Sequence, residues 1–334
     1  MIFGKINHII LLGGSRCTAE LALYISQSTS FKFEVYTAPR QVTDVIYSDG
    51  TTFEKYFNKH SIKYFVTDDI NHEPRFIESI SELTLSIGLG EAWSFNEEII
   101  EKFNGRLIDL MGIRLPQYRG GAHYTWQILR GNRIGACNLQ IVNKDMIQGI
   151  YDSGEIIKFK EYLFPAEARI PDDYFGFAVS QEISFIKEFI NELTQNKDFS
   201  TFKLQENFSI YFPRLHTLKN AFINWQWDTI DIEKFICAFD SPYAGATTQI
   251  NNILVRLLNV RSEQCDGQFH PFQCGLIYKI YNGNLYVATS QGTIIISEVN
   301  DEKGFSVIHT LKNGDRFFTP NDWIEKGMTT KIKY

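Results

Sequence analysis

The first half of the chain alternates short apolar runs with segments long enough for helices. The apolar runs cover residues 8–12, 33–36, 64–66, 83–87 and 107–110. Among the intervening segments, 18–25 has the helical spacing of apolar residues, and 52–59 and 96–103 have sufficient length. Strands that alternate with helices form a mostly parallel sheet whose two faces are covered. We therefore predict an α/β fold for this half.

A glycine-rich turn, Gly13-Gly14-Ser15, follows the first apolar run. Such a turn at the start of a helix can bind a phosphate group, because the backbone N–H groups there are free. The turn lacks the Gly-x-Gly-x-x-Gly spacing of a dinucleotide site. We favour the simpler interpretation of a tight connection between a strand and a helix.

A long helix is predicted to begin at Pro171. Apolar residues recur at intervals of three and four as far as Leu193, and Asp172 and Asp173 place carboxylates in the first turn, where the helix dipole favours them. The polar stretch 194–201 then has the composition of a linker. We therefore expect one domain over residues 1–200 and a second over residues 201–334.

The second half of the chain predicts one helix and several short strands. The helix covers 230–239, and β-rich runs follow at 253–260, 276–281, 284–289 and 293–299. Asn282-Gly283 and Gln291-Gly292 separate neighbouring runs in the manner of hairpin turns. This pattern predicts a small antiparallel, OB-like β-barrel.

Size and composition agree with two folded domains. A chain of 334 residues exceeds the roughly 250 to 300 residues at which single cores stop growing. The sequence contains 27 Phe and 16 Tyr, and because aromatic side chains favour interfaces, we expect a homodimer face on the second domain. No apolar run approaches the roughly 20 residues that cross a bilayer, and no signal peptide is apparent, so we expect a cytoplasmic protein without a membrane partner.

The net charge and the arrangement of the cysteines disfavour nucleic-acid-binding and disulfide-rich classes of protein. The net charge of −6 disfavours a large nucleic-acid surface, because affinity for phosphate backbones comes from clustered Lys and Arg. The five cysteines are scattered and odd in number, which indicates reduced thiols. Cys265, His270 and Cys274 lie within ten residues of one another, but a structural zinc site normally has four ligands, so we predict no metal.

A stretch rich in motifs lies between residues 83 and 157. It contains Leu115-Pro116-Gln117-Tyr118-Arg119-Gly120-Gly121, then Trp126, and then Gly149-Ile150-Tyr151-Asp152-Ser153-Gly154. These residues resemble the active-site core of the folate-dependent formyltransferases. The stretch 236–246 in the second half is similar to the C-terminal module of the methionyl-tRNA and sugar-nucleotide formyltransferases. The resemblance implies a Rossmann-like catalytic domain and N10-formyltetrahydrofolate as the formyl donor.

The resemblance also implies catalytic positions. The family carries Asn-x-His before Leu-Pro-x-Tyr-Arg-Gly, together with a later Asp, whereas this chain has Asp109-Leu110-Met111 and keeps Asp152. Two carboxylates in one pocket do not both ionise readily. Our hypothesis is therefore that Asp109 and Asp152 act as a coupled pair, one as a neutral hydrogen-bond donor and one as a general base. The alternative is that Asp109 only ends a strand and that catalysis is lost or moved.

Because Met111 cannot exchange a proton, we also sought another base. His123, after the glycine turn, is the candidate, either as a catalytic or substrate-binding group or as a histidine that starts a helix. Asn138 and Gln140 alternate with apolar neighbours and are candidate amide donors.

The resemblance further implies a folate-binding segment. Ile87, Gly88, Leu89 and Trp93 stand where the family backbone meets the pterin. Arg119 and Gly120 are expected to bind the cofactor together with Asp152. Arg119 has the planar fork suited to a carboxylate or phosphate, although a structural clamp of the loop is the alternative.

The resemblance implies an N-formyltransferase that acts on the amine of a nucleotide-linked amino sugar. The acidic charge favours this small-molecule acceptor over transfer RNA. Two alternatives remain open, a related acyl or one-carbon transferase with another donor, and a non-catalytic protein that binds folate or nucleotide.

Overall fold

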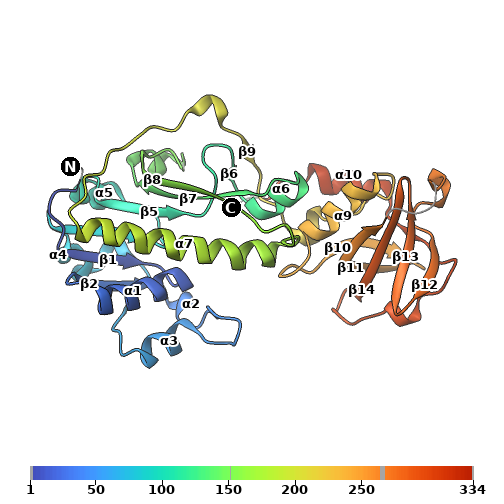
Figure 1. The fold of residues 1–334 in the computed structure, drawn as a ribbon, viewed down its shortest axis with the longest axis horizontal. Coiled ribbons are helices and arrows are strands. Elements are labelled where there is room, and N and C mark those ends of the chain that lie inside the picture. The colour runs from blue at the N-terminus through green and yellow to red at the C-terminus, as the bar shows by residue number, and fades with distance from the viewer. Residues whose placement is uncertain (1–2, 151, 264–267, 333–334) are drawn as a thin grey trace. The chain divides into compact units, whose positions relative to one another are not determined.

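The computed structural model describes residues 3–150, 152–263 and 268–332 (Figure 1). The described chain divides into two compact units. The first unit comprises residues up to 119 with 134–163 and 177–210, and the second comprises 120–133, 164–176 and the chain from 211 onward. The chain thus passes between the units several times, and the expected domain division at residue 200 stays a prediction.

The first unit is built on a mostly parallel sheet, as predicted. Its described strands pair in the order β3-β2-β1-β4-β5-β7-β8, with β1 to β5 parallel and β7 and β8 antiparallel. The strand bounds are β1 His8–Leu12, β2 Lys32–Thr37, β3 Phe65–Val66, β4 Thr84–Gly88, β5 Leu107–Met111, β7 Ile134–Ile141 and β8 Ile156–Leu163. The order reverses between β1 and β4, and in open sheets of this kind ligands bind beyond the carboxyl ends of the strands near such a point.

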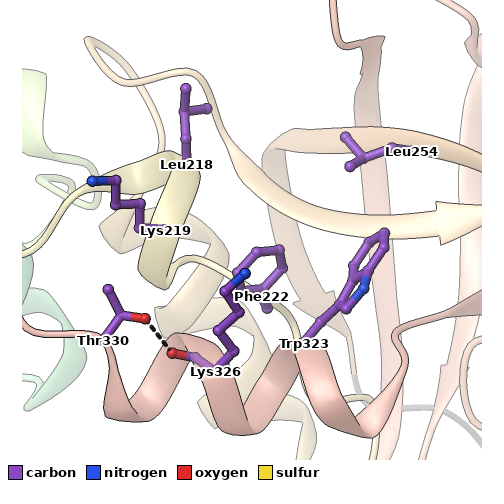
Figure 2. A pocket seen from close by; sticks show the side chains of 7 residues that line it. All are labelled: Leu218, Lys219, Phe222, Leu254, Trp323, Lys326 and Thr330. Atoms are coloured by element: carbon purple, nitrogen blue, oxygen red, sulfur yellow. Dashed lines mark hydrogen bonds between the residues drawn. The ribbon is translucent and has the colours of Figure 1, made fainter.

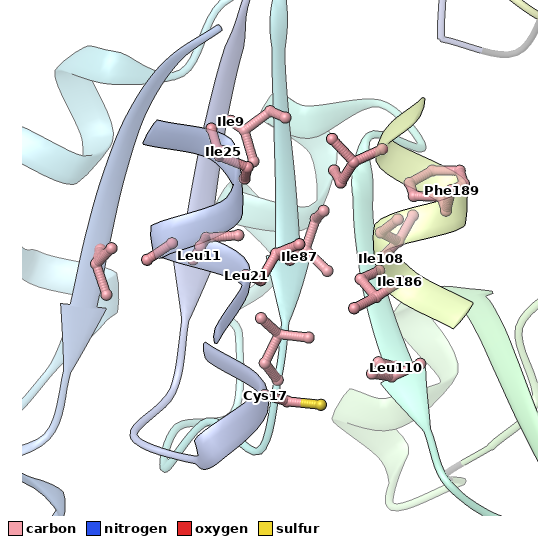
Figure 3. Packing of buried hydrophobic residues seen from close by; sticks show 14 of the residues in the cluster. Ile9, Leu11, Cys17, Leu21, Ile25, Ile87, Ile108, Leu110, Ile186 and Phe189 are labelled. Carbon is pink, nitrogen blue, oxygen red and sulfur yellow. The ribbon is translucent and has the colours of Figure 1, made fainter. Parts of the chain in front are cut away.

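Helices cover both faces of this sheet. On one face, α1 (Arg16–Ser28) and the later part of α7 (Pro171–Thr194) pack against β1, β4 and β5. Figure 3 shows Leu21 and Ile25 of α1 and Ile186 and Phe189 of α7 directed at isoleucines and leucines of the strands. On the other face, α4 (Pro74–Ser79) and α5 (Glu97–Phe103) contribute to a second buried cluster. Each fully buried side chain of this size contributes about 1.5–3 kcal/mol to folding.

The turn at Gly13-Gly14-Ser15 connects β1 to α1, as predicted. The Ser15 Oγ accepts a hydrogen bond from the Thr18 N–H at 3.3 Å and so caps the helix. The same hydroxyl donates to the carbonyl of Leu89 at 2.8 Å. The turn therefore fixes the segment that follows β4. Two further predicted helices are α3 (Phe53–Lys59), capped by Thr52, and α5, capped by Asn96.

The second unit contains an antiparallel sheet in the order β12-β13-β14-β11-β10-β15. The strand bounds are β10 Ala246–Ile250, β11 Ile253–Glu263, β12 Ile277–Tyr281, β13 Asn284–Thr289, β14 Gly292–Asp301 and β15 Phe317–Phe318. A bridge between Leu276 and Arg316 brings the two edges of the sheet together. The sheet therefore curls into the small barrel-like form that the sequence predicted.

Helices complete the second unit. The predicted helix is α9 (Thr229–Ala238), which packs on β11 and β14. Three shorter helices are α6 (His123–Leu129), α8 (Thr217–Asn220) and α10 (Asn321–Thr329). Within the described ranges, no helix has the length and apolar character needed to cross a membrane.

Candidate functional site

A small polar pocket lies at the carboxyl ends of β4 and β5 in the first unit. Its volume is about 80 Å³. The polar side chains that line it are Glu91, Asp109, Gln140, Asn143, Asp152 and Ser153. Three of these are carboxylates, and two of the three were predicted as catalytic. The structure thus brings Asp109 and Asp152 into one pocket and adds Glu91.

Glu91 and Asp109 converge on Gly88, the last residue of β4. Gly88 pairs with Asp109 across the parallel β4–β5 ladder. A Cβ atom on Gly88 would lie 2.6 Å from Oε2 of Glu91 and 2.8 Å from Oδ1 of Asp109, closer than such atoms pack. A side chain at position 88 would therefore displace at least one of the two carboxyl groups. Gly88 thus leaves space for the two acids, and its expected contact with folate stays a prediction.

The proximity of these acids changes their protonation. Burial, the charge of Glu91 and the charge of Asp152, in that order, raise the pKa of Asp109 well above its ordinary value. Burial raises the pKa of Glu91 to about 7. Burial also raises the pKa of Asp152, while the positive charge of Arg119 opposes that rise. Asp109 is therefore the group that most strongly retains a proton, and Asp152 has a cation to stabilise its ionised form.

The loop that carries Asp152 is held from several sides. Asp152 has a positive φ of 57°, an uncommon conformation for a residue with a side chain. Arg119 Nη2 donates to the carbonyl oxygen of Asp152 at 3.0 Å, and the amide of Gln140 donates to the carbonyl of Gly154 at 2.9 Å. A Cβ atom on Gly154 would overlap the carbonyl oxygen of Ile141. The segment Asp152-Ser153-Gly154 is thus held by two side-chain donors that bind its backbone and by close packing that only glycine permits at position 154.

Arg119 acts as a clamp in this structure. Its two terminal nitrogens bind both carboxylate oxygens of Glu206, at 2.6 and 2.8 Å, in addition to the carbonyl of Asp152. This fork-to-fork geometry is the strongest form of Arg–carboxylate contact. The contacts fit the structural alternative that we weighed for Arg119, and its binding of a cofactor stays a prediction.

Met111 and Asn138 occupy the neighbouring positions on β5 and β7. Met111 packs with Ile113, Leu115 and Ile156, which is the role of an apolar filler. The side-chain amide of Asn138 donates to the carbonyl of Ile113 and so holds the segment after β5. Both amides proposed as donors, Asn138 and Gln140, therefore bind backbone carbonyl groups. Gln140 still lines the pocket.

His123 lies at the start of α6, in the second unit. It does not line the pocket that contains Asp109. Its Nδ1 atom is buried and finds no hydrogen-bond partner within the described residues, and burial lowers its pKa to about 4. Such an imidazole is neutral at physiological pH. A catalytic role for His123 stays a prediction.

The other expected folate-binding residues have varied positions. The side chains of Ile87 and Leu89 are buried in the core, and the Leu89 N–H donates to the carbonyl of Leu12 at 2.8 Å. Trp93 packs beside the second core cluster, and its indole N–H donates to the carbonyl of Asp68 at 3.0 Å. Gly120 lies in the second unit, in strand β6 (Arg119–Gly120), which pairs with β9 (Tyr211–Phe212). Their contacts with a folate stay predictions.

Metal ligation has little support in the part of the chain that is described. No group of three or more His, Cys, Asp or Glu side chains there has the arrangement of a metal site. Cys265 of the weighed Cys265-His270-Cys274 set lies outside the described residues. His270 Nδ1 accepts the N–H of Phe272 at 3.2 Å and thereby caps a short helix. Cys17, Cys137, Cys237 and Cys274 are free thiols.

Sequence reasoning missed Glu91 because Gly90-Glu91-Ala92 has the composition of an exposed loop. The signal that could have found it is positional. An acid that follows the carboxyl end of a parallel strand by a few residues lies at the edge where such sheets bind ligands. The pocket can therefore hold a proton on Asp109, accept one at an ionised acid, and bind a small polar group between them.

A family model for the C-terminal domain of formyl transferases matches residues 217–314. Two relatives in sequence are methionyl-tRNA formyltransferases. That of Blochmanniella floridana is 24% identical over 266 residues, which cover 77% of each chain. That of Acetivibrio thermocellus is 23% identical over 232 residues, which cover 68% of this chain and 70% of the relative.

Solved structures share the fold. An N-formyltransferase from Helicobacter canadensis, in complex with folinic acid and dTDP-3-aminofucose, has a TM-score of 0.65 and 17% identity, covering 88% of this chain and 99% of its own. A sugar 3N-formyltransferase, WlaRD, with dTDP and 5-N-formyl-THF, has a TM-score of 0.64 and 17% identity, covering 90% and 100%. The domain match, the relatives along most of the chain and the shared fold together support a folate-dependent formyltransferase family for this chain.

Proposed function

We propose that this protein is an N-formyltransferase that moves a formyl group from N10-formyltetrahydrofolate to the amine of a nucleotide-linked amino sugar. The observation that carries the proposal is the pocket in which Asp109, Glu91 and Asp152 meet at the ends of β4 and β5. The match to the C-terminal domain of formyl transferases and the similarity to methionyl-tRNA formyltransferases support a one-carbon transferase. The altered pair Asp109 and Met111 is part of the proposal.

Formyl transfer needs an acid and a base close together. The amine nitrogen attacks the formyl carbon, a C–N bond forms, and the carbonyl electron pair moves to oxygen. The oxyanion needs a donor, and the attacking nitrogen must lose a proton. The bond from the formyl carbon to N10 then breaks, and N10 takes up a proton, so that the products are a formamide and tetrahydrofolate.

We assign the neutral donor to Asp109 and the general base to Asp152. Asp109 retains its proton because burial and two neighbouring carboxylates raise its pKa. A protonated carboxyl group donates a hydrogen bond, as the Asn of the family pattern does. Asp152 faces the charge of Arg119, which favours its ionised form. Glu91 keeps Asp109 protonated by charge repulsion and is therefore a positioning residue.

The size of the pocket is consistent with the reacting groups. A volume of about 80 Å³ is smaller than the roughly 300–1,000 Å³ of sites that enclose drug-sized ligands. It suits a formyl group and an amine, rather than a whole folate. The carboxylates, and the amide and hydroxyl groups of Gln140, Asn143 and Ser153, provide polar partners around that space.

The acceptor class is inferred from the similar structures and from charge. The Helicobacter canadensis enzyme is a complex with a dTDP-linked amino sugar, and WlaRD is a sugar 3N-formyltransferase. The net charge of −6 does not favour a long nucleic-acid partner. Methionyl-tRNA is the second candidate acceptor, because the sequence relatives are methionyl-tRNA formyltransferases.

The test is to incubate the purified chain with N10-formyltetrahydrofolate and separate acceptors. These are dTDP- and UDP-linked amino sugars, their hydroxyl analogues and methionyl-tRNA. We expect the mass of an amino sugar nucleotide to increase by one carbonyl group, with no change in the hydroxyl analogues. Formylation of methionyl-tRNA alone would refute the acceptor class. Binding of the folate without transfer to any amine would refute the enzyme and favour a binding protein.

A further inference from the structure

An apolar recess lies in the second unit between α8, α10 and β11. Its volume is about 440 Å³. Leu218 of α8, Phe222 just after it, Leu254 of β11 and Trp323 of α10 form its walls (Figure 2). The rings of Phe222 and Trp323 have centroids 5.7 Å apart, and Leu218 is 52% exposed. This volume falls within the roughly 300–1,000 Å³ range of small-molecule sites.

Two lysines give the recess a positive charge. Lys326 follows Trp323 by one helical turn, so both side chains lie on the same face of α10. Lys326 lines the recess and is exposed to solvent, and Figure 2 shows its side chain rising from α10 on the side of Phe222. Lys219 is at the rim, on α8. No acidic side chain lines the recess, and neither lysine forms an ion pair with a described residue.

We propose that this recess is a binding site for a free small organic anion with a flat aromatic body. The aromatic and aliphatic walls bury the body, and the ammonium group of Lys326 pairs with the anionic head, whether carboxylate, sulfonate or phosphate. The volume of about 440 Å³ is that of a small-molecule site, and the two lysines favour an anion over a neutral ligand. The site is independent of the formyl-transfer pocket.

The test compares two fluorescent probes that share a body and differ in charge. The anionic probe is anilinonaphthalene sulfonate, and N-phenyl-naphthylamine lacks the sulfonate. Both are titrated against the full chain. We expect the wild type to bind the anionic probe more tightly. Lys326→Gln should weaken binding of the anionic probe about fivefold, which is the effect of losing a partly exposed ion pair. The affinity for the neutral probe should not change.

Two further variants locate the site. Leu218→Asp places a carboxylate at an exposed position of the wall of the recess. It should therefore weaken binding of both probes, and binding of the anionic probe more strongly. Lys303→Gln is the matched control, since Lys303 is an exposed lysine of the same unit outside the recess. Thermal melting confirms that each variant is folded.

Four results would overturn the proposal. The first is an affinity for the anionic probe that is the same in wild type and Lys326→Gln. The second is binding of the probes to Leu218→Asp as tightly as to wild type. The third is probe affinity that falls with protein concentration while sedimentation shows a dimer, because the recess would then be an interface between copies. Failure of both probes to bind the wild type also refutes the site.

Discussion

Replacing Glu91 by Gln should make the protein more stable at neutral and alkaline pH. Burial raises the pKa of Glu91 from its ordinary value of 4.5 to about 7. In the unfolded chain this group ionises above about pH 4.5, whereas in the folded chain it resists ionisation until about pH 7. Folding stability therefore falls as pH rises through this interval and stays lower above it. At about 1.4 kcal/mol per unit of pKa, the cost approaches about 3 kcal/mol.

The measurement is urea unfolding of wild type and Glu91→Gln at about pH 4 and about pH 8. Glutamine keeps the shape of the side chain and removes its charge. We expect the variant to be more stable by up to about 3 kcal/mol at the higher pH and nearly equal to wild type at the lower pH. Glu78→Gln, at an exposed position of α4, is the control and should show no such dependence. An equal difference at both pH values, or a less stable variant at about pH 8, would refute the reasoning.

Three further predictions concern the same region. Asp109→Asn should flatten the dependence of kcat/KM on pH without abolishing turnover, and an unchanged profile would remove Asp109 from the mechanism. Arg119→Gln should lower the free energy of unfolding by about 1–2 kcal/mol, because the variant loses the paired hydrogen bonds to Glu206. Glu206→Gln should lower it by a smaller amount. Equal stability of wild type and both variants in urea would contradict the role of Arg119 as a clamp. Gly154→Ala should lower the free energy of unfolding by about 1–3 kcal/mol, because the new methyl group would overlap a carbonyl oxygen. Gly176→Ala, which adds a methyl group in open space on α7, should raise it by about 0.4–1 kcal/mol. Melting temperatures that shift in the same direction in both variants would contradict the packing argument.

The buried strands of the first sheet were predictable because their residues are apolar on both faces. β1 is buried throughout, and its run in the sequence has the same bounds. By contrast, β8 was not predicted. Only its first two residues are buried, and the rest of the strand, which includes Lys158, Lys160 and Glu161, is partly or fully exposed, as in an edge strand.

The strand β10 was missed for a different reason. Its polar residue Thr248 is fully buried because partners distant in sequence satisfy it. The Trp225 indole N–H donates to the Thr248 hydroxyl at 3.0 Å, and the hydroxyl of Thr319 lies 2.9 Å away. The local sequence pattern does not show such distant partners. The polar residues of β10 therefore resembled a loop.

The candidate site was predictable only in part, because some of its contacts join residues that are distant in the sequence. The motifs identified Asp109 and Asp152 and the glycines near them. Glu91 reaches Asp109 only because β4 pairs with β5 in a register that sets Gly88 opposite Asp109. The bonds of Arg119 to Glu206 likewise join residues that are 87 positions apart. Pairing register and long-range contacts follow from the fold, rather than from neighbouring residues.

The most direct test of the proposed chemistry is single-turnover formyl transfer from N10-formyltetrahydrofolate to an amino sugar nucleotide by wild type and Asp152→Asn. Binding of a folate analogue to each protein is measured in parallel. We expect transfer by the wild type and a rate reduced by about 10² or more in the variant, with analogue binding retained. Equal transfer rates in the two proteins would contradict the account of the carboxylate pocket.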